Sequence, residues 1–337
     1  MEMMDSREEG QIMSAANYYS NDFEWDLLRQ DIEKDPSFAH HLLPFPNQNQ
    51  ETHLSSLCTQ QEDSEAWNNF HTRHSTGKFF KERRYLLKEF PELASCKECS
   101  TVLEVGCGNG STALPILRGN KSISLYACDC SKEALERAKE NIDAANINLA
   151  KERFATFQCD FSASGFPNWL VCTSCRESFF QKQNMCSADA RSCSKQDFPD
   201  LPISAKNNSC IGGVDFVTLI FTLSAVPLHR MSRAITECFS VLKPGGLLLV
   251  RDYGLYDMTM LRFEPEQRVG YREYMRSDGT RSYFFCLDNV RDLFCGTGFS
   301  ELELEYCCVQ SVNRRNGKNM RRVWIHGKFQ KPHVHLG

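Results

Sequence analysis

The stretch that most constrains the fold of this chain is residues 101–111, where an apolar run leads directly into alternating glycines. The run 101–105 has the composition of a buried strand, and Gly106, Gly108 and Gly110 follow it. Glycine lets the backbone turn sharply and approach a ligand closely, in conformations that a Cβ atom disfavours. The G-x-G-x-G spacing lacks the third glycine of the dinucleotide fingerprint G-x-G-x-x-G, so there is less reason to expect a pyrophosphate. A nucleoside that carries an amino-acid tail fits this turn better.

Strand-like and helix-like segments alternate along the rest of the chain. We predict strands at 101–105, 124–127, 154–157, 215–221 and 247–251, helices after 111 and at 132–143 and 231–241, and then a helix at 287–295 with strands at 302–309 and 323–329. Regular alternation of strand and helix produces a doubly wound, mostly parallel sheet, so the predicted fold class is α/β. The last two strands are predicted to add to that sheet in an antiparallel arrangement at its C-terminal end.

A chain of 337 residues is long enough for one large domain with appendages. Residues 1–64 are polar, and we predict an N-terminal extension that is partly disordered. Residues 65–100 predict a helical cap of two helices, ended by Pro91. Residues 101–332 are predicted to form the main domain, with a Cys-rich insertion at about 165–212.

Charge and apolar content narrow the possible partners. The net charge of −4 gives no global attraction to nucleic acid, so any such surface must be local. Two basic clusters are candidates, with ordinary solvated surface as the alternative interpretation: Lys78, Lys81, Arg83, Arg84 and Lys88, and Arg314, Arg315, Lys318, Arg321 and Arg322. No apolar run approaches the ~20 residues that cross a bilayer, which predicts no membrane partner. With an acidic start unlike a targeting peptide, we expect a cytoplasmic protein, with the nucleus as the alternative.

The seventeen cysteines predict reduced thiols rather than disulfides, because we expect no secretory signal and a large core. The insertion region holds Cys172, Cys175, Cys186, Cys193 and Cys210, and Cys96 and Cys99 form another pair. A four-thiolate zinc site is one interpretation. The spacing after Cys175 matches no common zinc module, so we predict reduced surface cysteines and no metal site.

Four residues near strand ends are candidates for a nucleoside cofactor site. Glu104 could receive an ammonium group directly or through water. Asp129 ends the second strand, where a carboxylate can accept hydrogen bonds from both ribose hydroxyls. Asp160 follows the third strand and suits the exocyclic amine of adenine; a helix N-cap is the alternative role for either aspartate. Ile220 ends the fourth strand and would lie at the pocket rim, or in the core.

Several runs resemble the methyltransferase-like enzymes that form 3-methylcytidine in tRNA. The most specific are residues 251–257 (RDYGLYD) and 274–285 (YMRSDGTRSYFF); Trp67, 79–83 (FFKER), 261–263 (LRF) and 328–332 (KFQKP) fit as well. The resemblance spans roughly residues 65–332. It implies a Rossmann-like class I methyltransferase fold that uses S-adenosyl-L-methionine.

The resemblance also implies site residues and partners. Cofactor contacts are implied at the matching positions Trp67, Gly106, Asp129, Asp160 and Ile220, to which Gly108 adds the second glycine of the turn. His71 stands where relatives have a tyrosine four residues after the tryptophan, and the Cys-rich insertion departs from shorter relatives. In the family the target is a cytidine in the tRNA anticodon stem-loop, and some members act with an aminoacyl-tRNA synthetase or another helper protein.

The absence of two sequence motifs limits the kinds of atom that can accept the methyl group. Residues 220–227 (IFTLSAVP) replace the Asp/Asn-Pro-Pro-Tyr motif of exocyclic-amine methyltransferases. No Pro-Cys dipeptide supplies the nucleophile that carbon-five methylation of cytosine requires. A ring nitrogen, an oxygen, a protein side chain or a small molecule remains as the acceptor. Cytosine N3 has a lone pair in the neutral base, so positioning rather than a strong base should dominate catalysis.

For that reaction the sequence predicts a set of catalytic residues. Asp252 would stabilise the cation of the methylated base, Arg251 or Arg281 would orient base or phosphate, and Phe79 or Tyr253 would stack on the ring. The alternative is that Arg251 and Asp252 form a structural ion pair. Two other functions stay open, a small-molecule or protein methyltransferase that shares only the core, and a catalytically silent RNA-binding partner. A basic surface that converges on the pocket mouth would favour RNA.

Overall fold

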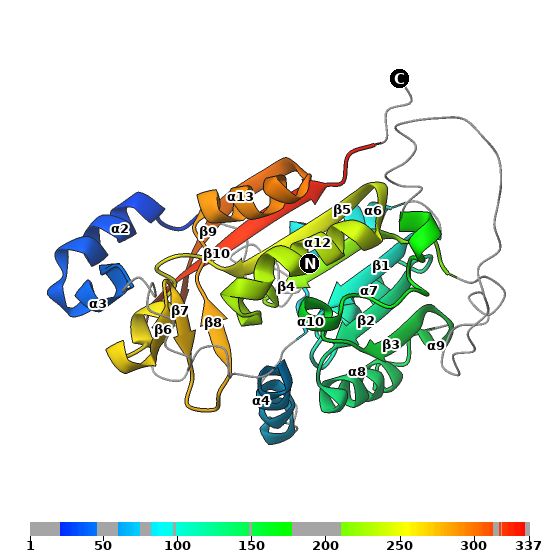
Figure 1. Ribbon diagram of the computed structural model, residues 1–337, viewed down its shortest axis with the longest axis horizontal. Helices are drawn as coiled ribbons and strands as arrows, with labels where there is room; N and C mark the ends of the chain where they lie inside the picture. Colours follow the sequence, from blue (N-terminus) through cyan, green and yellow to red (C-terminus); the bar gives the residue numbers. More distant parts are fainter. Residues whose placement is uncertain are drawn as a thin grey trace, which may run out of the picture.

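The structure is a computed structural model that describes residues 21–45, 60–74, 82–96, 99–147, 150–176, 210–312, 317 and 319–333. Its main sheet consists of β1 (Thr101–Val105), β2 (Ser124–Asp129), β3 (Phe154–Gln158), β4 (Val214–Ile220), β5 (Leu242–Tyr253), β9 (Ser300–Val312) and β10 (Asn319–Gln330). These strands lie in the spatial order β3-β2-β1-β4-β5-β10-β9 and run through the middle of the molecule (Figure 1).

Strands β1 to β5 pair in parallel, whereas β10 is antiparallel to both of its neighbours. Trp324 on β10 lies opposite Tyr253 on one side and Cys307 on the other. The predicted doubly wound α/β sheet with an antiparallel C-terminal strand is thus confirmed. β10 lies between β5 and β9 rather than at the edge, and its continuous buried run from Val323 to Phe329 is the pattern of a strand covered on both faces.

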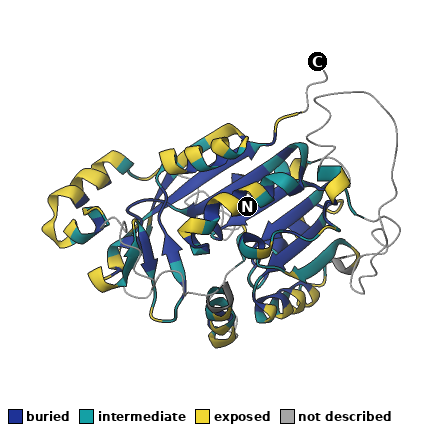
Figure 2. Cartoon of the chain, in the orientation of Figure 1, coloured by how far each residue is buried: buried dark blue, intermediate teal, exposed yellow. Residues whose placement is uncertain are grey.

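Helices cover both faces of the sheet. One face carries α10 (Phe161–Ser164), α12 (Leu228–Val241) and α13 (Leu287–Thr297), and the other carries α7 (Ala113–Gly119), α8 (Lys132–Ala144) and two helices of the cap. The buried residues of α12 recur at helical spacing: Met231, Ala234, Ile235, Cys238 and Val241. In Figure 2 the central strands of the sheet are buried and the outer helix faces are exposed. The short α9 (Ala150–Arg153) precedes β3.

In its described residues the cap contains three helices instead of the predicted two: α4 (Gln60–Arg73), α5 (Leu86–Glu89) and α6 (Glu92–Ser95). Pro91 does not end the cap, because it is the N-cap of α6. Proline is compatible with a helix start, where its missing N–H would have no intrahelical partner.

The N-terminal extension is more ordered than the sequence predicts. Helices α2 (Trp25–Lys34) and α3 (Ala39–Leu42), joined by the 3₁₀ turn η1 (Pro36–Phe38), pack beside a second sheet of β6 (Arg268–Gly270), β7 (Glu273–Met275) and β8 (Arg281–Tyr283). Leu28 and Ile32 from α2 are fully buried in the same cluster as Tyr274 and Phe284. Residues 1–20 and 46–59 lie outside the described residues.

Three further 3₁₀ turns are η3 (Leu223–Ala225), η4 (Met260–Arg262) and η5 (Pro265–Gln267). The predicted insertion leaves the domain after α10 and returns at β4, and its residues 177–209 lie outside the described part. Among the residues that the structure describes, no helix has both the length and the apolar character that a membrane crossing requires.

Candidate active site

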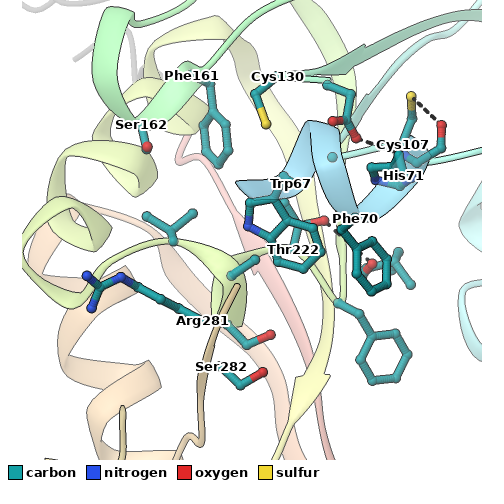
Figure 3. Close-up of a pocket in the computed structure, with 18 of the residues that line it drawn as sticks. Trp67, Phe70, His71, Cys107, Cys130, Phe161, Ser162, Thr222, Arg281 and Ser282 are labelled. Carbon is teal, nitrogen blue, oxygen red and sulfur yellow. Dashed lines mark hydrogen bonds between the residues drawn. The ribbon is translucent and has the colours of Figure 1, made fainter. Parts of the chain in front are cut away.

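A cavity of about 450 Å³ opens at the carboxyl ends of β1, β2 and β4, beneath α4 (Figure 3). This is the edge at which ligands bind in open α/β sheets. Nine residues that the sequence analysis selected line the cavity: Trp67, His71, Gly106, Gly108, Asp129, Asp160, Ile220, Tyr253 and Arg281. The fold therefore brings together residues that are far apart in the sequence, from the cap to β8.

Position 106, the first glycine of the turn, has no room for a side chain because Thr222 lies against it. Gly106 has a φ of +66°, and a Cβ at this position would lie 2.5 Å from Cγ2 of Thr222. Thr222 is fixed in turn, because its hydroxyl donates a 2.8 Å hydrogen bond to the carbonyl of Val105. Any side chain at position 106 would therefore displace the wall of the cavity.

Asp129 is held by the same turn. One carboxylate oxygen accepts a 2.9 Å hydrogen bond from the N–H of Gly108, and the other accepts one of 2.9 Å from the N–H of Ser131. The N-cap of α8 is Ser131, whose hydroxyl accepts from the N–H of Ala134 at 3.2 Å. The capping role is therefore taken by Ser131, and each Asp129 oxygen has a further lone pair for a ligand hydroxyl.

Asp160 lies at the N-cap position of α10 but makes no side-chain capping bond. Its two oxygens accept hydrogen bonds from the hydroxyls of Ser162, at 2.8 Å, and Ser64, at 3.1 Å. Figure 3 shows Phe161 and Ser162 with Cys130 along one side of the cavity. This side combines an aromatic ring, a thiol and a carboxylate, which is a suitable set for a purine with an exocyclic amine.

Helix α4 lies over the cavity and is held by polar contacts in its first turn and in its middle. Asp63 forms ion pairs with Arg230 and Arg281, each at 3.4 Å, and Asn68 accepts a 3.0 Å hydrogen bond from Ser131. His71 lies over the glycine turn, because a Cβ on Gly108 would be 3.6 Å from its ring. Burial lowers the pKa of His71, so its ring is neutral at pH 7.

Glu104 lies behind the glycine turn and is almost fully buried. Burial raises its pKa to about 8, although the nearby Arg83 lowers it in part. In the described part of the chain its Oε2 atom has no hydrogen-bond partner. A buried acceptor without a partner is costly, and an ammonium group at this position would remove that cost.

Arg83 lines the cavity and was assigned only to a basic cluster by the sequence analysis. Its Nε donates to the hydroxyl of Ser111 at 3.3 Å, and its guanidinium lies 4.9 Å from the ring of Phe221. Its Nη1 is buried, and within the described residues it has no hydrogen-bond partner. Together, Glu104 and Arg83 offer a carboxyl group and a guanidinium, which suit the ammonium and the carboxylate of an amino-acid tail.

The two polar residues at the end of β5 lie behind the cavity wall. Arg251 is fully buried and forms an ion pair with Glu89 at 2.5 Å, with its guanidinium 4.4 Å from the ring of Trp324. Neither Arg251 nor Asp252 is among the described residues that line the cavity. The predicted direct contact of these two side chains with a base is not what the structure shows, because both are used in packing the sheet.

Asp252 instead supports the cavity wall from behind. Its carboxylate accepts hydrogen bonds from the N–H groups of Ser224, at 2.9 Å, and Tyr253, at 2.8 Å. Ser224 belongs to η3 and lines the cavity. Burial raises the pKa of Asp252 to about 6, although these hydrogen bonds lower it in part.

The end of the cavity away from Asp129 is rich in arginine. Arg276, Arg281 and Arg322 line the cavity with Tyr253 and Trp324, whereas Arg230 also lines it but pairs with Asp160 at 4.0 Å. Arg322 pairs with Asp257 at 2.9 Å and lies 5.0 Å from the Trp324 ring. Arg281 and Tyr253 were predicted as site residues and Arg322 was assigned to a basic cluster, whereas no role was predicted for Arg230 or Trp324. The proposed stacking residue Phe79 lies outside the described residues.

Comparisons with known proteins assign the family. A family model described as a methyltransferase domain matches residues 79–304. The human tRNA N(3)-cytidine methyltransferase METTL6 is 37% identical over 278 residues, which cover 81% of this chain and 82% of that protein. The tRNA N(3)-methylcytidine methyltransferase Mettl2 of Drosophila melanogaster is 32% identical over 79% of this chain and 70% of its own length. The chain belongs to the tRNA N(3)-cytidine methyltransferase family.

A solved structure supports the fold of this family member. A chain in the complex between the Trm112 methyltransferase activator of Haloferax volcanii and a methyltransferase matches with a TM-score of 0.51. It is 14% identical and covers 82% of this chain and 99% of its own, so the similarity concerns the fold alone.

S-adenosylmethionine is the cofactor of this methyltransferase, and the residues present fit it. Arg83, Asp129 and Asp160 line the cavity. Glu104 is not among the described residues that line it, but it stands two residues before Gly106, and its buried Oε2 has no partner within the described part of the chain. These groups are of the chemical kinds that an amino-acid tail, a ribose and an adenine require. Glu104 could be predicted as a site residue from its position near the end of a strand. Arg83 could be recognised as one only from the tertiary structure, which places the cap against the sheet.

Proposed function

We propose that this protein transfers the methyl group of S-adenosylmethionine to N3 of a cytidine in the anticodon loop of a tRNA. The observation that carries the proposal is a single cavity with two chemically different ends. One end has the carboxylates for a nucleoside cofactor, at Asp129 and Asp160, and the other has arginines beside two aromatic rings. The human and Drosophila relatives are named for this reaction.

S-adenosylmethionine, when bound, supplies an electrophilic methyl group on its sulfonium. We assign the ribose hydroxyls to Asp129, the adenine to Asp160 and Phe161, and the methionine end to Glu104 and Arg83. Trp67, His71 and Ile220 line the cavity around this site, and α4 shields it from water. Exclusion of water strengthens each of the charged contacts.

The acceptor needs orientation more than activation. N3 of neutral cytosine carries a lone pair, so no residue has to remove a proton before attack. We assign the base to the space beside Tyr253 and Trp324, where an aromatic side chain can stack on it. Burial raises the pKa of Tyr253, so its hydroxyl stays neutral and can donate a hydrogen bond to the base.

Asp252 acts as a positioning residue in this scheme. Its hydrogen bond to the N–H of Ser224 fixes η3, and so the wall against which the base rests. Its negative charge also lies behind the place where the methylated base becomes cationic, which favours that charge through a medium of low dielectric constant. Arg251 fixes the same strand end through Glu89.

The arginine-lined end favours RNA over a small acceptor. N3 lies on the Watson–Crick edge, so the target must be a loop nucleotide or one that leaves its stack. Arg281 and Arg322 are oriented by the carboxylates of Asp63 and Asp257. The hydrogen bonds of Arg276 go to uncharged oxygens, of Thr280 and of the Arg281 backbone, so its charge is more available to a phosphate.

The partners and compartment follow from this substrate. An aminoacyl-tRNA synthetase or another helper protein would add contacts to the tRNA body, which is too large for the cavity to recognise. We expect the enzyme where its tRNA is found, in the cytoplasm or the nucleus.

The test is methylation of an unmodified anticodon stem-loop and of full-length tRNA, with nucleosides identified by mass spectrometry against standards. We expect 3-methylcytidine, and none when Gly106→Ala replaces the wild type. Each reaction is repeated with the cognate synthetase added. If only 5-methylcytidine, a ribose-methylated nucleoside or no methylated nucleoside forms under all of these conditions, the proposal is wrong. Methyl transfer to small catechols or amines without any transfer to tRNA would favour the small-molecule alternative.

A further inference from the structure

Three cysteines that the active site does not use meet at one point of the fold. The sulfur atoms of Cys172, Cys175 and Cys210 all lie within 4.8 Å of one another. The sulfurs of Cys175 and Cys210 are 3.5 Å apart. Cys172 is buried and the other two are half-buried. Along the chain Cys210 is far from the other two, so the spacing alone could not reveal this cluster.

The cluster lies where the Cys-rich insertion leaves the domain and returns to it. Ile211 donates its N–H to the carbonyl of Trp169 at 2.8 Å, and Gly213 donates to that of Leu170 at 2.8 Å. Leu170 is fully buried in the main core, and the Trp169 ring packs 5.0 Å from that of Phe157. The backbone that carries the three thiols is therefore fixed from both sides before any ligand binds.

The surroundings of Cys210 favour a thiolate. The N–H groups of Cys172 and Gly212 and the Cys175 thiol donate hydrogen bonds to the Cys210 sulfur. Thiolate is the form in which cysteine binds metals. Backbone N–H groups that point at a sulfur also compensate part of the negative charge that a cluster of thiolates accumulates.

A disulfide does not account for the cluster. A sulfur–sulfur bond is about 2.05 Å long, much shorter than the separation of Cys175 and Cys210, and it would leave the buried Cys172 beside it without a role. In a tetrahedral zinc site each Zn–S bond is about 2.3 Å, which places sulfur atoms about 3.8 Å apart. Small side-chain rotations bring the three sulfurs from their present separations to that value.

We propose that Cys172, Cys175 and Cys210 bind one zinc ion as thiolates, and that this ion holds the two ends of the Cys-rich insertion next to each other. Each thiol loses one proton to solvent on binding, and the fourth tetrahedral position takes a ligand from outside this trio. Reduced cysteines and no metal site were expected from the sequence, and a zinc site replaces that expectation. The site is structural, since it lies apart from the residues that line the cavity.

The test is zinc content of the full chain, produced in zinc-containing medium and purified under reducing conditions without chelators. We expect about one zinc per chain by elemental mass spectrometry. Exchange for cobalt(II) should give the near-ultraviolet sulfur-to-cobalt absorption of a thiolate site. The double variant Cys175→Ser/Cys210→Ser should lose both the metal and this band. The matched control is Cys295→Ser, which changes an exposed cysteine on α13 and should keep both.

A second measurement covers the case in which the serine variants fail to fold. Wild-type protein is alkylated with one reagent in its metal-bound state, then treated with chelator and alkylated with an isotopically heavy reagent. The heavy label should appear on Cys172, Cys175 and Cys210. The proposal is wrong if the purified chain holds less than about one tenth of a zinc, if the double variant keeps its zinc, or if the heavy label appears only on other cysteines. A Cys175–Cys210 disulfide in place of metal would also overturn it.

Discussion

Arg251 and Glu89 form an ion pair in which both side chains are fully enclosed, at 0% and 1% exposure, and the pair joins the end of β5 to the helical cap. Loss of one partner would leave the other charge buried and uncompensated, which typically costs about 3–5 kcal/mol. We therefore expect Arg251→Met or Glu89→Gln to lower the free energy of unfolding by that amount, and the double variant by clearly less than the sum.

Arg291→Met is the matched control for this prediction. The Arg291–Glu301 pair has the same chemistry at 2.9 Å, but the Arg291 side chain is 45% exposed. Exposed pairs contribute little to stability because water screens their charges, so this variant should stay close to the wild type in urea unfolding. If Arg251→Met and Arg291→Met lower the free energy of unfolding equally, the buried pair does not contribute more to stability than the exposed one.

His326 predicts a dependence of stability on pH. Burial lowers the pKa of its ring, but hydrogen bonds from Nδ1 to Glu89, at 3.1 Å, and from Nε2 to Glu303, at 3.0 Å, raise it above the ordinary value of 6.5. A raised pKa in the folded state gives stability that is complete below pH 6.5 and is lost as pH rises through the folded value. Urea unfolding from pH 6 to pH 9 should show this loss in the wild type and a flatter profile in His326→Gln. A variant as pH-sensitive as the wild type would assign the effect to another group.

Asp129→Ala should abolish cofactor binding while the chain remains folded. The substitution removes two charge-assisted bonds to the ribose, so affinity for S-adenosylmethionine should fall at least about 100-fold by calorimetry. It also frees the N–H groups of Gly108 and Ser131, so a modest decrease in melting temperature is expected. Asp292→Ala changes an exposed aspartate on α13 and should leave both values unchanged. Unchanged affinity in the Asp129 variant would remove this residue from the cofactor site.

Glu104 predicts that cofactor binding releases a proton. Burial raises its pKa to about 8 in the free protein, and an adjacent ammonium would favour the carboxylate. Affinity for S-adenosylhomocysteine should therefore increase by up to about 50-fold between pH 6 and pH 8. At pH 7, calorimetry in buffers of different ionisation enthalpy should show proton release in the wild type and much less in Glu104→Gln. Equal release in both proteins would contradict the assignment.

Asp252→Asn should reduce the methyl-transfer step more than cofactor affinity. The amide keeps the shape but cannot accept the hydrogen bonds from both Ser224, in η3, and Tyr253. A decrease of about 10–100-fold in the single-turnover rate is therefore expected, with cofactor affinity within about threefold. Burial raises the pKa of Asp252 to about 6, so the wild-type rate should rise with pH through that value and the variant should lack this inflection. A variant with both the wild-type rate and the wild-type pH profile would exclude a positioning role.

The sequence by itself determined the sheet and the cofactor turn. Local geometry alone accounts for the apolar runs that form β1 to β5 and for the helical spacing of the buried residues of α12. The positions of Gly106 and Asp129 at strand ends likewise depend only on their own segments. Long, strongly periodic elements were therefore predicted within a few residues of their observed bounds. The short strands β6, β7 and β8 were missed, because three residues carry too little periodicity to be recognised.

Only the tertiary structure decided which polar residues face the cavity. Arg251 and Asp252 adjoin one another in a specific motif, yet the sheet turns one toward Glu89 and the other toward Ser224, while Arg83 from the cap reaches the cofactor turn. The ordered structure of α2 likewise depends on its packing in the same cluster as Phe284. The proximity of Cys175 to Cys210 depends on the hydrogen bond from Ile211 to Trp169. These contacts join residues far apart in the chain, and their direction is set by packing and by the pairing of buried charges, which no local pattern of residues encodes.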